Sequence, residues 1–445
     1  MKQRIISLFC LMLAAVLLAP AALAAWQPPE EAGAPEAAAV YLVELDTGTV
    51  LYERNADEPR AIASLTKMMT CLLLAESDAD LDETFLVPQE LAEEFWHIRA
   101  EDGAYIDLHV GEETNLRDLM YCTMLPSTND TASTIAWRLA GSIDAFVEQM
   151  NARAAQLGCE NTQYSCPHGL YDAGNWSTAR DLARIAAACM ENETLRTVCT
   201  SCEWWLPLNN FQTVVRTPDA PEGMYLRIGS SIQMQNPASP LYRPWVRGVK
   251  TGFTDAAGRC IVTMAETDTG RYLLVLLGEP NRKAENGIQI LHNDAAALLD
   301  WAVARFEVGQ ALSADAPLAE VPVRWCEEAA ALPVYPAGTL TALLCADTPV
   351  ELETELTCAE LQAPVATGTQ VGTVTVRQNG EVLGTLPLEV RRDLPRSDEL
   401  YYRELLAPYR THILAGIGAV CLVLVLALCA LVRRARRRRA RALRR

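Results

Sequence analysis

An uncharged run of 20 residues, Ile413 to Val432, constrains this 445-residue chain more than any other feature. As a helix it is about 30 Å long, which matches the thickness of the hydrocarbon core of a bilayer. A buried core helix is the alternative interpretation. However, nine Arg follow in residues 433–445, and such a basic flank stays on the cytoplasmic side. The sequence therefore predicts a transmembrane helix at 413–432 and a cytoplasmic tail at 433–445.

The N-terminus has the pattern of a secretory signal peptide. Lys2 and Arg4 precede an apolar run from Ile5 to Leu18, and the small-residue pattern Ala22-Leu23-Ala24 follows. We expect residues 1–24 to be removed on export. The part of the chain between the two apolar segments is then outside the cytoplasm.

Composition narrows the classes of partner. The net charge is -18 although the tail contributes nine Arg, so the exported part is strongly acidic. An acidic surface repels nucleic acid, and the Arg tail is better explained as a topology signal beside anionic lipids. From the acidic charge we expect no nucleic-acid partner. The Cys and His residues show no metal-ligand spacing, so we also expect no metal and no cofactor. The disulfide pairing is left open.

Lysine is scarce enough to be informative. After the signal peptide only Lys67, Lys250 and Lys283 remain. An Arg side chain stays protonated, whereas a desolvated Lys can lose its proton near neutral pH and act as a base. The lysines are therefore candidates for chemistry.

The first motif is Ser64-Leu65-Thr66-Lys67, at the start of an apolar, helix-like run. Residues three apart share a helix face, so a neutral Lys67 amine is placed to take the proton of the Ser64 hydroxyl. A surface Ser beside a surface Lys is the alternative explanation. We predict that Ser64 is a nucleophile and Lys67 its base.

The second motif is Lys250-Thr251-Gly252, which precedes Phe253 and a strand-like segment at 259–265. On an edge strand it presents a cation and a hydroxyl to an anionic substrate, and the Gly permits close approach. An incidental surface tripeptide is the alternative.

The third motif is Ser127-Thr128-Asn129, in the entry turn of a helix-like stretch at 131–139. By itself it is typical of a helix N-cap. Beside the other two motifs, Ser127 is a candidate to relay a proton and Asn129 to hold an amide carbonyl.

The order SxxK, SxN, KTG resembles the penicillin-binding proteins and serine β-lactamases. Within that group the chain is similar to the serine-type D-Ala-D-Ala carboxypeptidases, which are low-molecular-mass penicillin-binding proteins of the peptidase S11 family. Further stretches carry the resemblance over roughly residues 38–308: a hairpin pattern at 40–53, Pro167-His168-Gly169-Leu170, and 177–183.

The resemblance implies an α+β fold. A penicillin-binding or β-lactamase-like transpeptidase domain, an antiparallel sheet flanked by helices, is expected at 36–308. Beyond it, short β-rich runs and an Asn379-Gly380 turn predict a small β-sandwich domain at 316–392. A partly helical stalk at 393–411 leads to the transmembrane helix.

The resemblance also implies roles for the motif residues. Ser64 is the acylated nucleophile, Lys67 the general base, and Ser127 with Asn129 the middle element. Substrate binding is assigned to Lys250, Thr251, Gly252 and Phe253, of which Lys250 and Thr251 bind the terminal carboxylate. The oxyanion hole consists of the backbone N–H groups of Ser64 and Phe253. Arg282 and Lys283 are candidates for one more carboxylate-binding residue.

The function implied is a membrane-anchored D,D-carboxypeptidase that removes the terminal D-Ala from peptidoglycan stem pentapeptides and is acylated by β-lactam antibiotics. It belongs at the bacterial cell membrane, single-pass, with the catalytic domain extracytoplasmic and the C-terminus cytoplasmic. A D,D-endopeptidase, a β-lactamase-like hydrolase and a non-catalytic cell-wall scaffold are the alternatives. A vegetative role and a sporulation role are both left open.

Overall fold

The computed structural model describes residues 35–170 and 174–442. The chain forms two compact units, Met1–Gly309 with Ala342–Pro349 and Gln310–Thr341 with Val350–Arg445. The predicted signal peptide at 1–24 lies outside the described residues.

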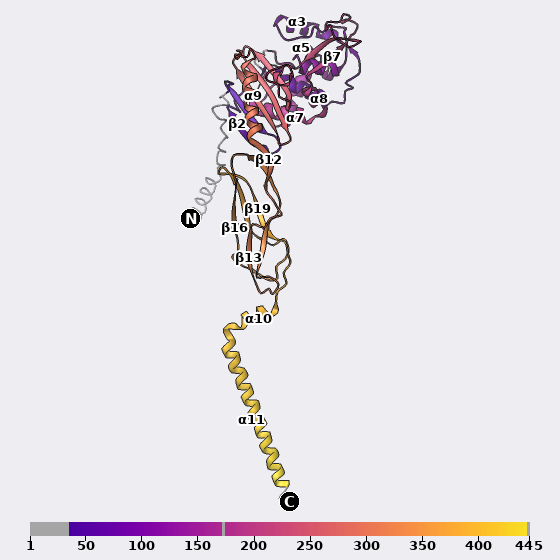
Figure 1. Cartoon of the computed structure of the whole chain (residues 1–445). Helices are drawn as coiled ribbons and strands as arrows, with labels where there is room; N and C mark the ends of the chain where they lie inside the picture. Colours follow the sequence, from indigo (N-terminus) through magenta and orange to yellow (C-terminus); the bar gives the residue numbers. More distant parts are fainter. Residues whose placement is uncertain (1–34, 171–173, 443–445) are drawn as a thin grey trace, which may run out of the picture. The chain divides into compact units, whose positions relative to one another are not determined.

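The first unit is built on a five-stranded antiparallel sheet with the strand order β2-β1-β11-β10-β9 (Figure 1). The hairpin expected at 40–53 is present as β1 and β2, and the KTG motif lies on β9, an edge strand as predicted. The bounds are β1 (Ala39–Glu44), β2 (Val50–Arg54), β9 (Val246–Thr254), β10 (Gly258–Thr267) and β11 (Gly270–Glu279).

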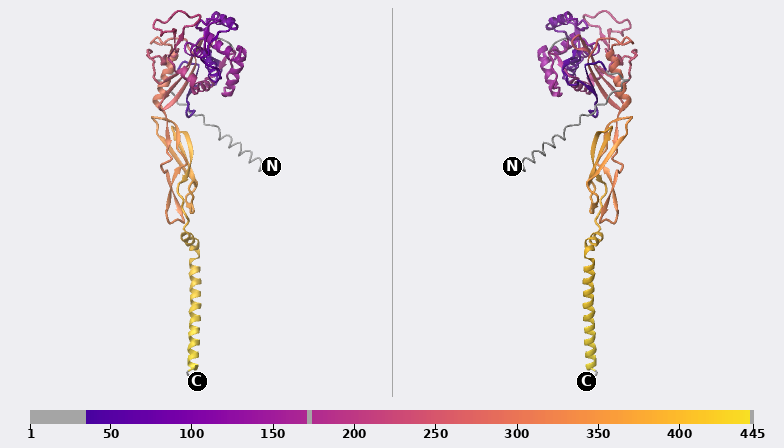
Figure 2. Two further views of the ribbon diagram at one scale, coloured as in Figure 1. Left: turned by 90° about the vertical axis from the view of Figure 1, so that its right-hand side faces the viewer. Right: turned by 90° about the vertical axis from the view of Figure 1, so that its left-hand side faces the viewer.

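The two faces of this sheet bury different cores, because successive side chains of a strand point to opposite sides. On β11, Leu273, Val275 and Leu277 join one cluster, and Leu274 and Leu276 join the other. Most of the helices pack on the first face, and Figure 2 shows them, coloured indigo to magenta, gathered on one side of the sheet. Helix α9 (Ile290–Arg305) packs on the second. Both faces are buried, as the family resemblance implies.

The remaining elements of the first unit are short strands, 3₁₀ turns and helices. They are β3 (Arg60–Ala61), η2 (Ala63–Thr66), α2 (Lys67–Ala75), β4 (Phe85–Leu86), η3 (Gln89–Leu91), α3 (Ala92–Ala100), β5 (Glu113–Thr114), α4 (Leu116–Met124), α5 (Asn129–Ala140), α6 (Ile143–Gln156), β6 (Trp176–Ser177), α7 (Ala179–Glu191), α8 (Glu193–Thr200), β7 (Glu203–Pro207), β8 (Met224–Gly229) and η4 (Gln233–Gln235).

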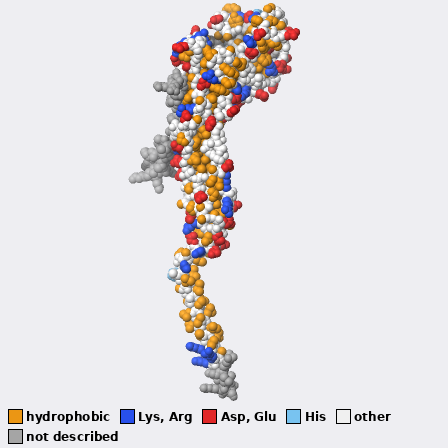
Figure 3. All heavy atoms as spheres, viewed as in Figure 1, with side chains coloured by type: hydrophobic (Ala, Val, Ile, Leu, Met, Phe, Trp, Pro, Cys, Tyr) orange, Lys and Arg blue, Asp and Glu red, His pale blue; other side chains and the backbone are white. Residues whose placement is uncertain are grey.

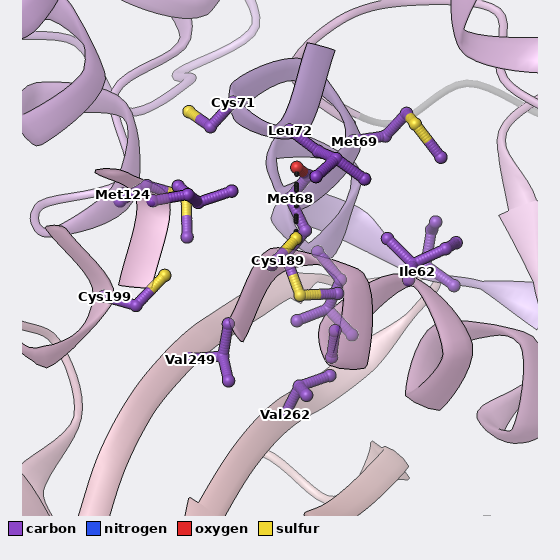
Figure 4. Packing of buried hydrophobic residues seen from close by; sticks show 14 of the residues in the cluster. Ile62, Met68, Met69, Cys71, Leu72, Met124, Cys189, Cys199, Val249 and Val262 are labelled. Carbon is purple, nitrogen blue, oxygen red and sulfur yellow. Dashed lines mark hydrogen bonds between the residues drawn. The ribbon is translucent and has the colours of Figure 1, made fainter. Parts of the chain in front are cut away.

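Helix α2 is the central helix of the larger core. Met68, Met69 and Leu72 are fully buried, and the thiol of Cys189 on α7 donates to the carbonyl of Met68 at 3.6 Å (Figure 4). A helix that is apolar on all sides is stable only when its neighbours enclose it. The first turn of α2, which begins at Lys67 of the SxxK motif, is therefore held from several directions.

The second unit contains a six-stranded sheet with the order β16-β18-β19-β14-β13-β17, which confirms the β-rich prediction. Asn379 and Gly380 both have positive φ, 54° and 81°, as a two-residue hairpin turn requires. The bounds of the sheet strands are β13 (Ala319–Arg324), β14 (Ala331–Pro336), β16 (Val350–Leu356), β17 (Leu361–Gln362), β18 (Gln370–Gln378) and β19 (Glu381–Val390). A separate two-stranded sheet pairs β12 (Phe306–Leu312) with β15 (Leu340–Cys345).

Three helical elements follow: α10 (Asp398–Leu406), η5 (Ala407–Tyr409) and α11 (Arg410–Ala442). Figure 3 shows apolar side chains covering α11 and a cluster of Arg near its end. By length and composition this helix can cross a membrane, and the apolar window within it has no buried residue. The predicted transmembrane segment at 413–432 lies entirely within α11.

The sequence pattern does not indicate that Ala342–Pro349 groups with the first unit. The strand expected at 340–344 forms as β15, but its last residues, from Ala342 on, belong to the first unit. The domain limits 36–308 and 316–392, like those of the stalk at 393–411, stay predictions.

Candidate active site

The SxxK motif spans the junction of a 3₁₀ turn and an α-helix. Ser64 lies in η2, and Lys67 is the first residue of α2. Side chains at i and i+3 eclipse each other in a 3₁₀ turn, which brings the two onto one face. Lys67 Nζ lies 2.9 Å from Ser64 Oγ.

Two further oxygens surround the amine. Lys67 Nζ donates to Asn129 Oδ1 at 2.6 Å and to the backbone carbonyl of His168 at 2.7 Å. Asn129 is the first residue of α5, so the SxN motif meets the SxxK motif through this bond. The structure thus brings Ser64 and Asn129 into direct contact with Lys67.

Burial changes the acid–base properties of both motif lysines. Lys67 and Lys250 are 0% exposed. Burial lowers the pKa of Lys67 well below its ordinary value, and the positive charge of Lys250 acts in the same direction. Burial also lowers the pKa of Lys250, to about 7. Desolvation is the cause that the sequence predicted for a lysine acting as a base.

A tight contact fixes the turn that carries Ser64. Ala63 has φ +47°, a region that non-glycine residues seldom occupy, and Thr66 Oγ1 donates to its carbonyl at 2.9 Å. Gly169 has φ +75°, and a β-carbon there would lie 1.9 Å from the carbonyl oxygen of Ala63. The glycine of the Pro-His-Gly-Leu stretch is required for this packing.

The residue before that glycine also has a defined environment. His168 Nε2 lies 3.0 Å from Glu94 Oε1, and Ser133 donates to the same oxygen at 2.9 Å. Burial disfavours the charged ring of His168, but Cys166 and Glu94 outweigh it and raise its pKa to about 9. These bonds hold the backbone carbonyl that accepts from Lys67.

The edge strand β9 passes directly beside the nucleophile. A β-carbon at Gly252 would lie 3.1 Å from the backbone nitrogen of Ser64 and 3.1 Å from the carbonyl oxygen of Ile62. Contacts this short are tighter than nine in ten real β-carbon contacts, so glycine lets the KTG strand approach Ser64 more closely than a residue with a side chain would.

An open cavity of about 360 Å³ lies in front of Ser64. Its walls include five predicted site residues: Ser64, Ser127, Thr251, Gly252 and Phe253. Ser127 has φ +71°, a strained conformation of the kind that concentrates at functional sites.

The other three predicted residues, Lys67, Asn129 and Lys250, are not among the cavity's lining residues. Lys250 Nζ donates to the carbonyl of Thr251 at 2.9 Å. Lys250 therefore lies behind the lining of the cavity. Its charge acts on the site, but its side chain contributes no surface to the cavity.

The lining also contains residues that the sequence patterns did not single out, and Arg259 and Ser231 are two of them. The guanidinium of Arg259 stacks on the ring of Phe253 at 4.1 Å, because β9 and β10 pair Phe253 with Arg259. Ser231 Oγ lies 2.7 Å from Thr251 Oγ1. The turn signal before β10 gives the register that pairs Arg259 with Phe253, whereas no sequence pattern points to Ser231.

The two basic residues suggested after the last core strand lie elsewhere. Arg282 forms an ion pair with Glu36, and Arg282 is not among the residues that line the cavity at Ser64. Lys283 lines a neighbouring cavity instead. Among the described residues, Arg259 is the cation that lines the cavity at Ser64.

Comparison with known proteins identifies the family. Residues 25–281 match the family described as D-alanyl-D-alanine carboxypeptidase. The chain belongs to this family. Residues 312–396 match the penicillin-binding protein 5 C-terminal domain, so the second unit also has its counterpart. The family and fold expected from the motifs are confirmed.

Individual relatives of this carboxypeptidase family member cover most of the chain. D-alanyl-D-alanine carboxypeptidase DacF of Bacillus subtilis is 27% identical, over 81% of this chain and 87% of the relative. A D-alanyl-D-alanine endopeptidase of Pseudomonas aeruginosa is 31% identical, over 62% and 83%. Penicillin-binding protein 5 of Haemophilus influenzae has a similar structure, with a TM-score of 0.57, 23% identity, and coverage of 83% of this chain and 99% of that one.

Proposed function

We propose that the chain is a membrane-anchored serine D,D-carboxypeptidase that removes the terminal D-Ala from peptidoglycan stem pentapeptides through an acyl-enzyme on Ser64. The observation that carries the proposal is the buried amine of Lys67, 2.9 Å from the Ser64 hydroxyl. Membership of the D-alanyl-D-alanine carboxypeptidase family supports the substrate class.

The surroundings of Lys67 favour a neutral amine acting as base. A neutral amine has two N–H groups and one lone pair. Asn129 Oδ1 and the His168 carbonyl can only accept, so they take the two N–H groups. The lone pair then faces Ser64, whose proton it accepts as Oγ attacks the substrate carbonyl.

The cavity walls bind and orient the substrate. The hydroxyls of Thr251 and Ser231 and the guanidinium of Arg259 receive the terminal carboxylate. Lys250, buried behind them, adds positive potential. Because Oδ1 of Asn129 is occupied by Lys67, its Nδ2 group is the end left to donate to an amide carbonyl of the substrate.

The tetrahedral intermediate requires donors at its oxyanion. The backbone N–H groups of Ser64 and Phe253 are proposed for this role, and the close approach of Gly252 to Ser64 supports it. Ser127 returns the proton to the leaving amine. Water then hydrolyses the ester on Ser64, restores its hydroxyl and releases the shortened peptide.

The same proposal includes the location. The segment 413–432 anchors the chain in the bacterial cell membrane, the catalytic unit is extracytoplasmic, and the Arg-rich tail at 433–445 is cytoplasmic. Peptidoglycan stem peptides are the substrates, and β-lactam antibiotics acylate the same serine.

A release assay with the full chain in detergent tests the proposal. We expect free D-alanine from a D-Ala-D-Ala-terminated pentapeptide, together with a long-lived penicillin adduct on Ser64 by mass spectrometry. Rapid penicillin turnover without a lasting adduct would indicate a β-lactamase. A folded chain that neither releases D-alanine nor gains the mass of penicillin would indicate a non-catalytic scaffold.

A further inference from the structure

A cysteine lies beside the residue whose backbone carbonyl accepts from the Lys67 amine. Cys166 comes two positions before His168 in the chain, and it is a free, partly exposed thiol. Its Sγ atom lies 3.7 Å from Nδ1 of His168 and accepts the backbone N–H of Gly169 at 3.3 Å. The mechanism proposed for the serine nucleophile does not use this thiol.

The imidazole ring of His168 is oriented as a base toward the thiol. Nε2 lies 3.0 Å from Glu94 Oε1, and this bond is the main cause that lowers the pKa of Glu94, so the carboxylate accepts and Nε2 donates. Nδ1 accepts the backbone N–H of Leu170 at 3.0 Å, which identifies it as the nitrogen with the lone pair. Nδ1 can therefore take the proton of Cys166. A thiol, a ring nitrogen and a carboxylate that orients the ring form an arrangement that activates a nucleophile.

The local charges favour the same proton transfer. Burial raises the pKa of Cys166, but the ring of His168 and the backbone donors outweigh burial, so this pKa lies below its ordinary value. Burial also disfavours the charged ring of His168, but Cys166 and Glu94 raise its pKa to about 9. By contrast, burial raises the pKa of the Cys260 thiol to about 11. Since the thiolate is the nucleophilic form, Cys166 has the environment of a reactive cysteine.

The backbone that follows the thiol is attached to helix α2. The carbonyl of Pro167 accepts from Thr70 Oγ1 at 2.5 Å, and the carbonyl of His168 accepts from Lys67 Nζ at 2.7 Å. A group attached to the sulfur of Cys166 needs room within this partly buried stretch. Making that room displaces the two carbonyls and removes an acceptor from the Lys67 amine.

The bulk and the charge of a modified Cys166 act on Lys67 in opposite directions. Burial and the charge of Lys250 lower the pKa of Lys67, whereas the negative charge of Cys166 raises it. Removing that charge alone therefore favours the neutral amine and faster acylation. A fall in acylation after modification would report displacement of the carbonyl instead.

We propose that Cys166 is a thiol–disulfide exchange site for small disulfides, and that the mixed disulfide blocks acylation of Ser64. The second part rests on the proposed function, because acylation of Ser64 is what the modification changes. The proposed extracytoplasmic location supports this class of ligand, since disulfides persist outside the cytoplasm.

The exchange needs the small disulfide as its only co-reactant. The Cys166 thiolate attacks one sulfur of the disulfide, so a new S–S bond forms and the old one breaks. The second sulfur leaves as a thiolate and takes the proton that the ring of His168 received from Cys166. A thiol reductant reverses the modification by the same exchange.

The test uses the full chain in detergent at pH 7, with bis(2-hydroxyethyl) disulfide as the probe. Peptide mass mapping gives the rate of modification at each Cys. Penicillin labelling gives the acylation rate of Ser64 before treatment, after it, and after reduction with dithiothreitol. We expect Cys166 to react about tenfold faster than the exposed Cys202. Acylation should fall about tenfold on modification and return on reduction.

Two pairs of variants separate the parts of the proposal. Glu94→Gln should slow the modification of Cys166 about tenfold, because the ring loses the carboxylate that orients it. Glu93→Gln is its matched control on the same helix, since the Glu93 side chain is 87% exposed, and it should react as the wild type does. Treated Cys166→Ser should keep the acylation rate of its own untreated sample, whereas Cys202→Ser should lose acylation as the wild type does.

The possible outcomes distinguish the exchange site from the proposed function. An unmodified Cys166 in a sample whose Cys202 has reacted overturns the exchange site. Complete modification of Cys166 with unchanged acylation, or loss of acylation in treated Cys166→Ser, overturns the block. A chain that reacts at Cys166 but takes up no penicillin even before treatment contradicts the proposed function and leaves the exchange site standing.

Discussion

Asn129 Oδ1 accepts a hydrogen bond from Lys67 Nζ at 2.6 Å, across 62 positions of sequence. With the lone pair of the neutral amine facing the Ser64 hydroxyl, as proposed, Asn129 has to present its oxygen to Lys67, which fixes the orientation of the amide. The bond also joins two motifs that are individually common in proteins. The combination explains why the site depends on both α2 and α5.

Replacing the base while keeping its charge separates the two roles of Lys67. An Arg at this position stays protonated, so Lys67→Arg should lower the rate of penicillin acylation roughly a thousandfold. The measurement is the adduct mass as a function of time. Ser64→Ala is the companion variant and should gain no adduct at any time. Rapid acylation of Lys67→Arg would show that another group removes the Ser64 proton.

Removing the neighbouring cation should change the pH dependence. Lys250 lowers the pKa of Lys67, so Lys250→Gln raises it, and a larger fraction of Lys67 is protonated at a given pH. The acid limb of the acylation rate against pH should therefore move to higher pH by about one unit. An unmoved limb in a variant that still binds penicillin would contradict the proposed coupling.

The close approach of β9 to Ser64 predicts a steric effect at Gly252. In Gly252→Ala the new β-carbon would lie 3.1 Å from Ser64 N, which displaces the nucleophile or the strand. The neighbours would have to give by a few tenths of an ångström, so we expect acylation to slow roughly tenfold. Gly338→Ala is the control, since nothing lies within 4 Å of its β-carbon position. Equal rates in the two variants would argue against the contact.

Arg259 should act mainly on substrate binding. Arg259→Gln removes the guanidinium that lines the cavity, so KM for the pentapeptide should rise about tenfold or more with a smaller change in kcat. Steady-state kinetics measures both values. Arg282→Ala should behave as the wild type because its partner is Glu36. A normal KM in Arg259→Gln would shift the carboxylate contact entirely to Thr251 and Ser231.

Deleting residues 410–445 tests the anchor. The deletion removes α11, so the protein should move from the membrane fraction to the soluble fraction. Penicillin labelling of Ser64 should persist, since the cavity is lined only by residues of the first unit. Fractionation followed by labelling measures both effects. Retention of the shortened chain in membranes would show that another segment binds lipid.

Much of the fold follows from local patterns. The hairpin at 40–53, the edge-strand position of Lys250-Thr251-Gly252 and the Asn379-Gly380 turn all formed as expected. In each case the information lies in neighbouring residues, through turn geometry or alternation along a strand. The helix that is long enough to span a membrane could be predicted for the same reason.

Other parts of the site depend on residues far apart in sequence. The carbonyl of His168 accepts from Lys67, yet a backbone oxygen has no side-chain signature. Arg259 enters the cavity through the cross-strand register with Phe253. The prediction that Lys250 contacts the substrate carboxylate stays untested, and the structure places this side chain behind the cavity wall.

The sequence alone determined the apolar segment that can span a membrane, and the spacing of three that sets the Ser64 hydroxyl beside the Lys67 amine, because both properties arise within a few helical turns. Tertiary structure decided the chemical state of that amine and the shape of the cavity in front of the hydroxyl. Lys67 loses its hydration shell and gains two acceptor oxygens from distant segments. Desolvation of this kind exists only when the whole unit is folded.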